Sequence, residues 1–207
     1  MSWTEPITRL WRKESEREEN EVTEQKAANT NGFDPEELQG AANMLQERPE
    51  AARVAFRSRH EWDEKFAVDG RAEEIEQAGQ VIRRSYDFRD DYPAELMGTD
   101  SGPAPMENLM AALGACVAST YASQAAARGI QIEELTVDLE AELDLRGMFK
   151  LAPVRPGLSG IRAKVRVKSD ADDAALEELG RLTAQVSPVF DSLSNPVPIE
   201  SSVEVTR

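Results

Sequence analysis

Two segments in the second half of the chain alternate strictly between apolar and polar residues. From residue 135 to 145 every odd position is apolar and every even position polar, mostly acidic; from 161 to 169 the even positions are basic instead, up to Lys168. Such alternation predicts strands with one buried and one wet face. Because opposite charges attract across strands, we expect antiparallel pairing, with Asp138 opposite Lys168 and Asp144 opposite Arg162.

A helical pattern precedes these strands. Pro105 at a first helical position, Glu107 in the first turn and Gly129 after the last turn predict a helix from residue 105 to about 128. Its side chains are almost all small, so neighbours can approach closely and most of its faces should be buried. One small domain cannot cover so many faces, and the helix therefore predicts a homodimer.

The pattern is weaker before residue 100. Residues 54–62, 64–75 and 80–88 are three strand candidates, and the Gly-, Pro- and Asp-rich segment 91–105 is expected to be a loop. Asp34 as N-cap, followed by Pro35, predicts a helix to about residue 46. We take residues 1–50, with 12 acidic and 6 basic side chains, as a helical, acidic N-terminal extension, and residues 51–207 as the main domain. Three apolar residues are expected to anchor the extension: Ile7, Leu10 and Trp11.

The last part of the chain predicts one longer helix and two short elements. Asp170 is the expected cap of a helix that ends near residue 186. Ser187 before Pro188 is typical of an N-cap that opens a short turn or helix. Three apolar residues, spaced for a strand, close the chain: Ile199, Val203 and Val205. Together the elements predict an α+β fold.

Composition excludes several classes of protein. The formal net charge of −15 argues against binding to nucleic acid or to an anionic membrane. One cysteine and one histidine cannot form a disulfide-stapled scaffold or an ordinary zinc site, and no nucleotide-binding motif is present. No signal peptide or clean membrane span is visible, so we expect a cytoplasmic protein. Because no nucleotide or metal motif is present, we also expect neither a cofactor nor a metal. The excess of acid fits either a high-salt source or ordinary solubilising charge.

Few residues offer chemistry. Cys116 is the only thiol, but a cysteine among Leu, Ala and Gly on a buried helix is more often an inert packing residue. It lies three turns into the helix, beyond the field of the helix N-terminus, so activation requires a cation from elsewhere. His60 would have to reach Cys116 to form a catalytic pair, and between Arg59 and Glu61 it is more typical of a surface residue.

Three segments resemble the OsmC/Ohr family of osmotically induced and organic-hydroperoxide-resistance proteins. The most specific is GTDSGPAPMENLMAALGACVASTYASQAAARGIQIEELTVDLEAELDLRG at residues 98–147. VRPGLSGIRAKVRVKSDA and SPVFDSLSNPVPIE fit one OsmC-like branch. The resemblance extends from about residue 52 to the end. It implies an intertwined homodimer in which sheets from both chains wrap a long central helix of each, with active sites at the dimer interface.

The resemblance also implies a site. Cys116 matches the cysteine that an organic hydroperoxide oxidises to sulfenic acid, and Ser187 stands where a resolving cysteine would precede the proline. Glu107 matches the family's glutamate, although it lies one residue closer to the cysteine than in the hydroperoxide-resistance branch. Arg57 and Arg59 are candidates for the arginine that holds the cysteine as a thiolate.

Two functions therefore compete. The first is a single-cysteine thiol peroxidase that reduces organic hydroperoxides with an external thiol. The second is a non-catalytic protein that binds an apolar ligand in the dimer cleft. A cation within about 4–6 Å of the sulfur would favour the first, whereas dry and uncharged surroundings would favour the second.

Overall fold

The structure, a computed structural model, describes residues 29–206. Ile7, Leu10 and Trp11, and most of the predicted extension, lie outside the described residues. The described elements begin with helix α2 (Pro35–Glu47), a 3-10 turn and a three-stranded sheet. The sheet comprises β1 (Val54–Trp62), β2 (Val68–Gln77) and β3 (Gln80–Asp90). The remaining elements are η2 (Ala94–Leu96), α3 (Pro105–Ala126), β4 (Glu134–Glu142), α4 (Leu145–Met148), β5 (Gly160–Lys168), α5 (Asp173–Val186) and α6 (Pro188–Ser194).

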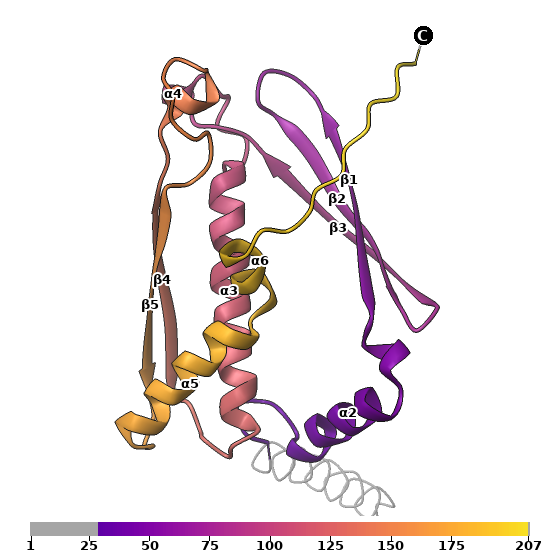
Figure 1. The fold of residues 1–207 in the computed structure, drawn as a ribbon, viewed down its shortest axis with the longest axis vertical. Coiled ribbons are helices and arrows are strands. Elements are labelled where there is room, and N and C mark those ends of the chain that lie inside the picture. The colour runs from indigo at the N-terminus through magenta and orange to yellow at the C-terminus, as the bar shows by residue number, and fades with distance from the viewer. Residues whose placement is uncertain (1–28, 207) are drawn as a thin grey trace, which may run out of the picture.

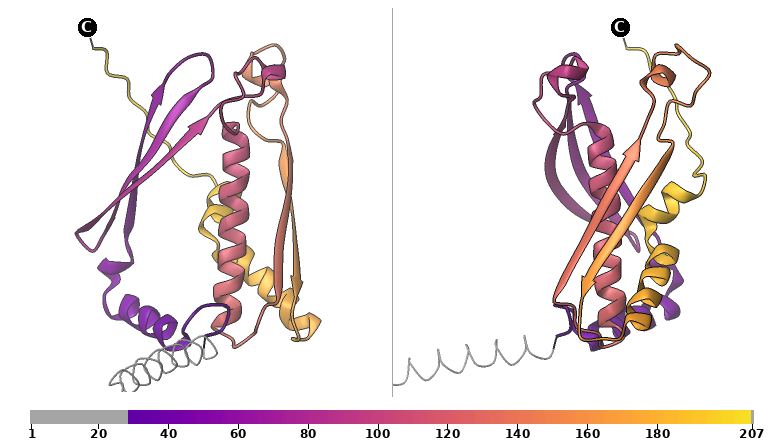
Figure 2. Two further views of the ribbon diagram at one scale, coloured as in Figure 1. Left: turned by 180° about the vertical axis from the view of Figure 1, so that it is seen from behind. Right: turned by 90° about the vertical axis from the view of Figure 1, so that its left-hand side faces the viewer.

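Helix α3 is the centre of the described molecule. Strands β4 and β5 run along one side of it, and α5 and α6 pack beside it, while the sheet β1–β2–β3 stands off on the other side (Figures 1 and 2). Both sheets are antiparallel, in the orders β1-β2-β3 and β4-β5. The α+β class, the long central helix and the antiparallel strands are therefore confirmed.

The core lies where α3, α5 and the β4–β5 pair meet. Tyr121, Ala125 and Leu179 are buried there, and the Tyr121 hydroxyl donates to the carbonyl of Leu176 at 2.8 Å. Burial raises the pKa of Tyr121. Gly114 allows the strand to approach, because a Cβ at this position would lie 3.3 Å from Leu139 Cδ1. The small residues of α3 thus serve close packing, as the sequence predicts.

The β4–β5 pairing confirms the predicted neighbours and corrects their register. Asp138 lies opposite Lys164, not Lys168, and Glu140 lies opposite Arg162. The strand ends early because Asp144 caps α4, accepting a hydrogen bond from the Arg146 amide at 2.9 Å. The apolar alternation continues to residue 145 and so overstated the strand.

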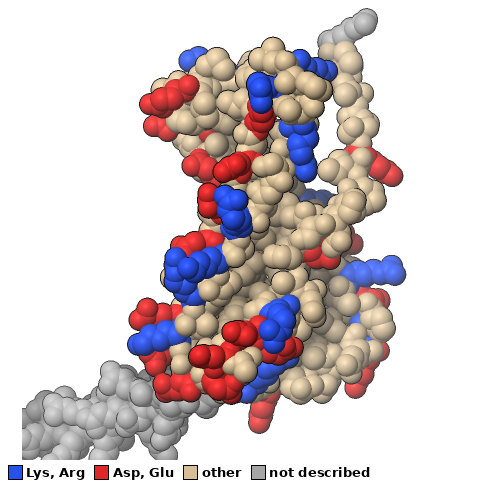
Figure 3. Space-filling model, turned by 60° about the vertical axis from the view of Figure 1, so that its left-hand side comes forward, with Lys and Arg blue, Asp and Glu red and all other residues tan. Residues whose placement is uncertain are grey.

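Charge complementarity survives the shift in register. Arg162 pairs with Glu140 at 2.8 Å, Arg166 pairs with Asp138, and Lys168 reaches Glu133. Acidic and basic side chains accordingly stand together on the outer surface of the molecule (Figure 3).

The sheet β1–β2–β3 is amphipathic, and neither of its faces is packed against the other elements of residues 29–206. All nine residues of β1 are exposed. Its register places most of the charged side chains on one face and the large apolar ones on the other. The exposed apolar residues of that second face are Val54, Phe56, Trp62, Ile82, Tyr86 and Phe88.

Three further expectations concern helix ends and the C-terminus. Asp34 caps α2 as predicted, through the amides of Glu36 and Glu37, although no residue of α2 is buried. The cap of α5 is Asp172 rather than Asp170, because Asp172 is three residues before the Ala175 amide that it accepts from. The predicted last strand is wrong for this single chain. Residues 195–206 form no strand, and Ile199 and Val203 are each 90% exposed.

Candidate functional site

Cys116 lies at the boundary between the buried and exposed faces of α3. Leu113 and Val117 are buried toward the core, whereas Ala115 and Ser119 are exposed, and Cys116 itself is half-buried. Successive helical residues rotate by about 100°, so the sulfur is set at the edge of the stripe that the core leaves open.

Ser187 is brought against this sulfur. It is fully buried between α5 and α6, where its amide donates to the Thr183 carbonyl and its own carbonyl accepts from the Asp191 amide. Its position is that of the predicted N-cap of α6, but its hydroxyl makes no capping hydrogen bond. The hydroxyl donates instead to Cys116 Sγ, at 3.2 Å. Among the described residues no other side chain hydrogen-bonds this sulfur.

Glu107 does not meet Cys116 within the chain. Its carboxylate accepts a hydrogen bond from the Ala104 amide at 2.7 Å and so caps the first turn of α3. Cys116 is nine residues further along the helix, which corresponds to about 13.5 Å along the axis. Nine residues make about two and a half turns, so the two side chains project from roughly opposite sides of the helix. Within one chain, Glu107 therefore stabilises the start of the helix and faces away from the sulfur.

Arg57 and Arg59 lie on the charged face of the open sheet. Arg57 pairs with Glu74 and Glu76, both at 3.0 Å, and the hydrogen bond that it donates to Glu76 is the main reason that its pKa is raised. Arg59 pairs with Glu61 at 2.9 Å. In the described part of the chain, neither guanidinium contacts Cys116 through a hydrogen bond. Both arginines are instead neutralised by local carboxylates.

His60 belongs to the opposite, apolar face of the same sheet. Its ring lies edge-on to Phe88, with centroids 5.4 Å apart, and its Nε2 is 3.2 Å from the Ser58 hydroxyl. It does not form a pair with Cys116 in the chain.

An apolar cavity of about 410 Å³ lies between α3, α6 and the start of β5. Leu109 and Leu113 line it from α3, and Phe190 lines it from α6. Leu113 is three residues before Cys116, and Phe190 is three residues after Ser187. The sulfur and the hydroxyl therefore lie about one helical turn beyond the inner end of the cavity. Sequence reasoning missed this cavity, since its outer wall comes from the Pro- and Gly-rich connector.

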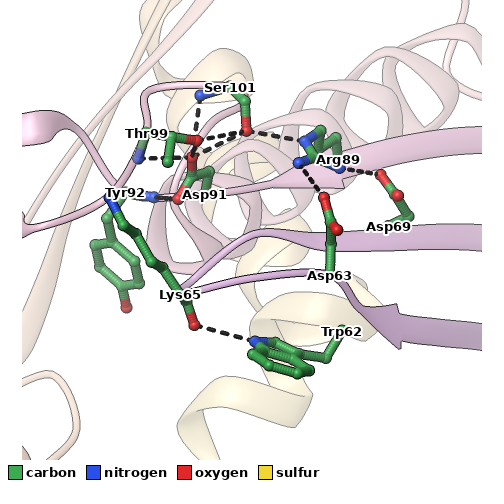
Figure 4. A network of polar contacts seen from close by, with 9 residues as sticks. All are labelled: Trp62, Asp63, Lys65, Asp69, Arg89, Asp91, Tyr92, Thr99 and Ser101. Carbon is green, nitrogen blue, oxygen red and sulfur yellow. Dashed lines mark hydrogen bonds and ion pairs between the residues drawn. The ribbon is translucent and has the colours of Figure 1, made fainter.

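A buried carboxylate organises the loop that leads into α3. Asp91 is fully buried. It accepts hydrogen bonds from the amides of Tyr92, Thr99 and Ser101, and from the hydroxyl of Thr99 and the hydroxyl of Ser101 (Figure 4). These bonds, led by that of the Thr99 hydroxyl, hold the pKa of Asp91 well below its usual range. In the sequence, this network corresponds to a Thr-Asp-Ser run eight residues after an acidic pair. The run lies in the segment 91–105, which the sequence predicts only as a loop.

The same network continues into the open sheet and into α3. The Ser101 hydroxyl accepts from Arg89, which also pairs with Asp63 and Asp69 (Figure 4). Next to Asp91, Asp90 accepts a hydrogen bond from the Asn108 side chain at 2.7 Å, in the first turn of α3. The network thus fixes where the cysteine-bearing helix begins.

The described residues include no group of His, Cys, Asp and Glu that could hold a metal ion. Within the same part of the chain, every helix is too short or too polar to cross a membrane.

Comparison with known proteins decides the family. The model of the family described as OsmC-like protein matches residues 98–202, which is half of the chain and includes Cys116, Ser187 and the residues that line the apolar cavity. The chain belongs to the OsmC-like family. The resemblance found in the sequence is thereby confirmed. The matched residues include the whole of α3, the small-residue helix that carries Cys116.

Solved structures support the OsmC-like fold. An OsmC-like protein from Mycoplasma pneumoniae matches with a TM-score of 0.55 and 17% identity, over 69% of this chain and 89% of that chain. An organic hydroperoxide resistance protein from Legionella pneumophila matches with a TM-score of 0.47 and 16% identity, over 67% of this chain and 88% of that chain. No curated protein matches significantly. At 17% identity the Mycoplasma pneumoniae structure establishes the fold only.

Proposed function

We propose that this protein is a single-cysteine thiol peroxidase that reduces organic hydroperoxides in the cytoplasm and is recycled by an external thiol. The observation that carries the proposal is the hydrogen bond from the Ser187 hydroxyl to Cys116 Sγ. A donor directed at sulfur suits the thiolate, which is the nucleophilic form of cysteine. The hydroxyl occupies the place of a resolving group but cannot form a disulfide.

The chemistry then follows in two stages. The Cys116 thiolate attacks one peroxide oxygen, the O–O bond breaks, and the leaving alkoxide takes a proton to become an alcohol. Cys116 is left as a sulfenic acid, oxidised by two electrons. One external thiol condenses with it, releasing water and leaving a mixed disulfide. A second thiol attacks that disulfide and restores Cys116.

We infer that the acting unit is a homodimer. The open sheet exposes an apolar face on which Phe56 is 76% and Trp62 72% exposed. Soluble monomers rarely leave such contiguous apolar faces uncovered. The C-terminal segment has the alternation of a strand but pairs with no strand among residues 29–206. A second chain would cover the sheet and could bring Glu107, Arg57 or Arg59 to a cysteine that each cannot reach within one chain. Light scattering that gave a mass of one chain at all concentrations would exclude the dimer.

We infer that residues 1–50 are an accessory extension of an OsmC-like domain spanning residues 51–207. The extension is held at its end, where Asn31 donates to the Ile130 carbonyl at 2.9 Å and accepts from the Ile132 amide at 2.8 Å. Removing residues 1–30 keeps this anchor and should leave a folded, soluble dimer. Aggregation of the truncated protein would show that the extension belongs to the core.

Thiol-dependent consumption of cumene hydroperoxide tests the peroxidase. Wild type should turn over with dithiothreitol, and Cys116→Ser should be inactive. Ser187→Ala should be slower, whereas Ser123→Ala, which removes a hydroxyl from the same helix as Cys116 but bound to the Thr120 carbonyl, should be unchanged. Wild type that consumes no peroxide above the level of Cys116→Ser would refute the proposal.

A second function has an observation of its own. The apolar cavity ends about one helical turn from Cys116, and among the described residues no arginine or lysine hydrogen-bonds the sulfur. A non-catalytic protein that binds an apolar ligand would need only the cavity. Ligand binding by wild type and by Cys116→Ser alike, with no peroxide consumption by either, would favour this alternative.

A further inference from the structure

Arg155 lines the apolar cavity, and none of the described carboxylates pairs with it. Besides Arg155, the principal side chains around the cavity are apolar: Met106, Leu109, Leu113, Ile161, Phe190 and Leu193. Its two serines are neutral, and the Ser159 hydroxyl is already bound to the Glu142 carbonyl at 3.0 Å. Arg155 is therefore the only charged side chain among the described residues that line this space.

The lack of a carboxylate partner sets Arg155 apart from most of the described arginines. The protein carries 39 acidic side chains and a net charge of −15. Most described arginines pair with a carboxylate, as Arg57, Arg89 and Arg162 do, but no ion pair of the described residues includes Arg155. The guanidinium instead extends past Gly157, where a Cβ would lie 3.4 Å from one of its terminal nitrogens. A free guanidinium beside an apolar space can bind an anion.

The cavity also has a direction. Met106 and the Arg155 loop lie toward the start of α3, while Leu113 and Phe190 lie toward the Cys116–Ser187 contact. Met106 and Cys116 are ten residues apart on the helix, which corresponds to about 15 Å along its axis. A ligand that fills the cavity would therefore have one end near a cation and the other near the sulfur.

We propose that the cavity binds an amphipathic monocarboxylate, with the carboxylate on Arg155 and the apolar chain along α3 toward Cys116. The apolar walls supply affinity through burial of the chain, and Arg155 selects the charged head. This deepens the proposed function, because it names the class of hydroperoxide that would be preferred, one carrying a carboxylate at the end remote from the peroxide. The binding itself requires no chemistry at the cysteine.

Isothermal titration with two non-oxidising probes tests the assignment. Decanoate and its neutral isostere decanamide should both bind the full-length protein, decanoate about three- to tenfold more tightly at low salt. Arg155→Gln should abolish this preference and leave decanamide unaffected. Lys150→Gln, an equal loss of charge in the same connector, should preserve it. Added salt should narrow the preference, since salt screens an exposed ion pair.

Three results would overturn the proposal: no binding of decanoate, equal affinity for the two probes, or a preference that persists in Arg155→Gln. Titrating Cys116→Ser separates this proposal from the peroxidase. A carboxylate preference in Cys116→Ser and wild type alike supports the site, whether or not wild type consumes peroxide. Peroxide consumption by a protein that shows no such preference would support the peroxidase and exclude this site.

Discussion

The two sheets obey the same alternation but differ in what covers them. In β4–β5 the apolar positions pack on α3 and α5, and the outward charges pair across the strands. In β1–β2–β3 the outward charges pair equally well, yet the apolar face stays exposed. Local pattern thus determines strands and ion pairs in both, whereas burial depends on a surface that only one sheet finds within its own chain.

Truncating the covered region should produce the largest effect. Leu179 is 1% exposed and belongs to the core cluster with Tyr121. Leu179→Ala should lower the free energy of unfolding by about 2–5 kcal/mol, through lost burial and the cavity left behind. Urea denaturation at several protein concentrations measures it. Phe56→Ala, on the open sheet, should lower the free energy of unfolding of the isolated chain much less. Equal losses of free energy in the two variants would contradict the proposed difference between the sheets.

A charge on the open apolar face should break the dimer without unfolding the chain. Phe56→Glu should weaken association by about 2 kcal/mol or more, because a desolvated interface position would receive an unpaired charge. Sedimentation velocity across a dilution series measures the shift toward monomer. Val81→Glu provides the control, since Val81 is also exposed but lies on the charged face of the same sheet. A dimer that tolerates Phe56→Glu would show that this face is not the interface.

The buried carboxylate that joins the open sheet to α3 should give the protein an acid limit. The pKa of Asp91 is lowered in the folded state, so its contribution to stability is complete above the unfolded-state pKa of about 3.9 and is lost as the pH falls below it. Asp91→Asn should be less stable than wild type at neutral pH, and the gap should narrow toward pH 2. Thermal melts from pH 2 to 7 measure this. A gap independent of pH would contradict the assignment.

The smallest effect should come from the outward charges of β4–β5. Arg162 pairs with Glu140 across the strands, but both side chains are more than two-thirds exposed. Because water and salt screen such pairs, Arg162→Gln should change the melting temperature only slightly, and the change should vanish in high salt. A large destabilisation that persists in high salt would contradict the small contribution to stability expected of this exposed ion pair.

Sequence reasoning was reliable where a local rule decides the outcome. Alternation located the strands, and Asp34, Pro105 and Gly129 marked helix ends because caps and positive-φ turns depend on a few neighbouring residues. It was unreliable where two local rules competed. The alternation through residue 145 predicted strand, but Asp144 turned the chain into α4 and moved the register.

The candidate site was predicted only in part, for a similar reason. Family resemblance paired Cys116 with Ser187, and the structure places these two side chains in contact. The role of the Ser187 hydroxyl could not be predicted, since its position favours a cap as much as a contact with sulfur. Arg155 lies in a connector without periodicity. Whether Glu107, Arg57 or Arg59 reaches the sulfur depends on the second chain of the proposed homodimer. Which of these groups gathers around the sulfur is set by tertiary and quaternary structure.

Trapping the oxidised cysteine is the most direct test of whether organic hydroperoxides oxidise Cys116 to a sulfenic acid. Wild type is treated with cumene hydroperoxide or with hydrogen peroxide in the presence of dimedone, and the peptide containing Cys116 is identified by mass spectrometry. We expect a sulfenic acid adduct on Cys116 that forms faster with the organic hydroperoxide than with hydrogen peroxide, and more slowly in Ser187→Ala. Cys116 that remains an unmodified thiol in a large excess of organic hydroperoxide at neutral pH would contradict it.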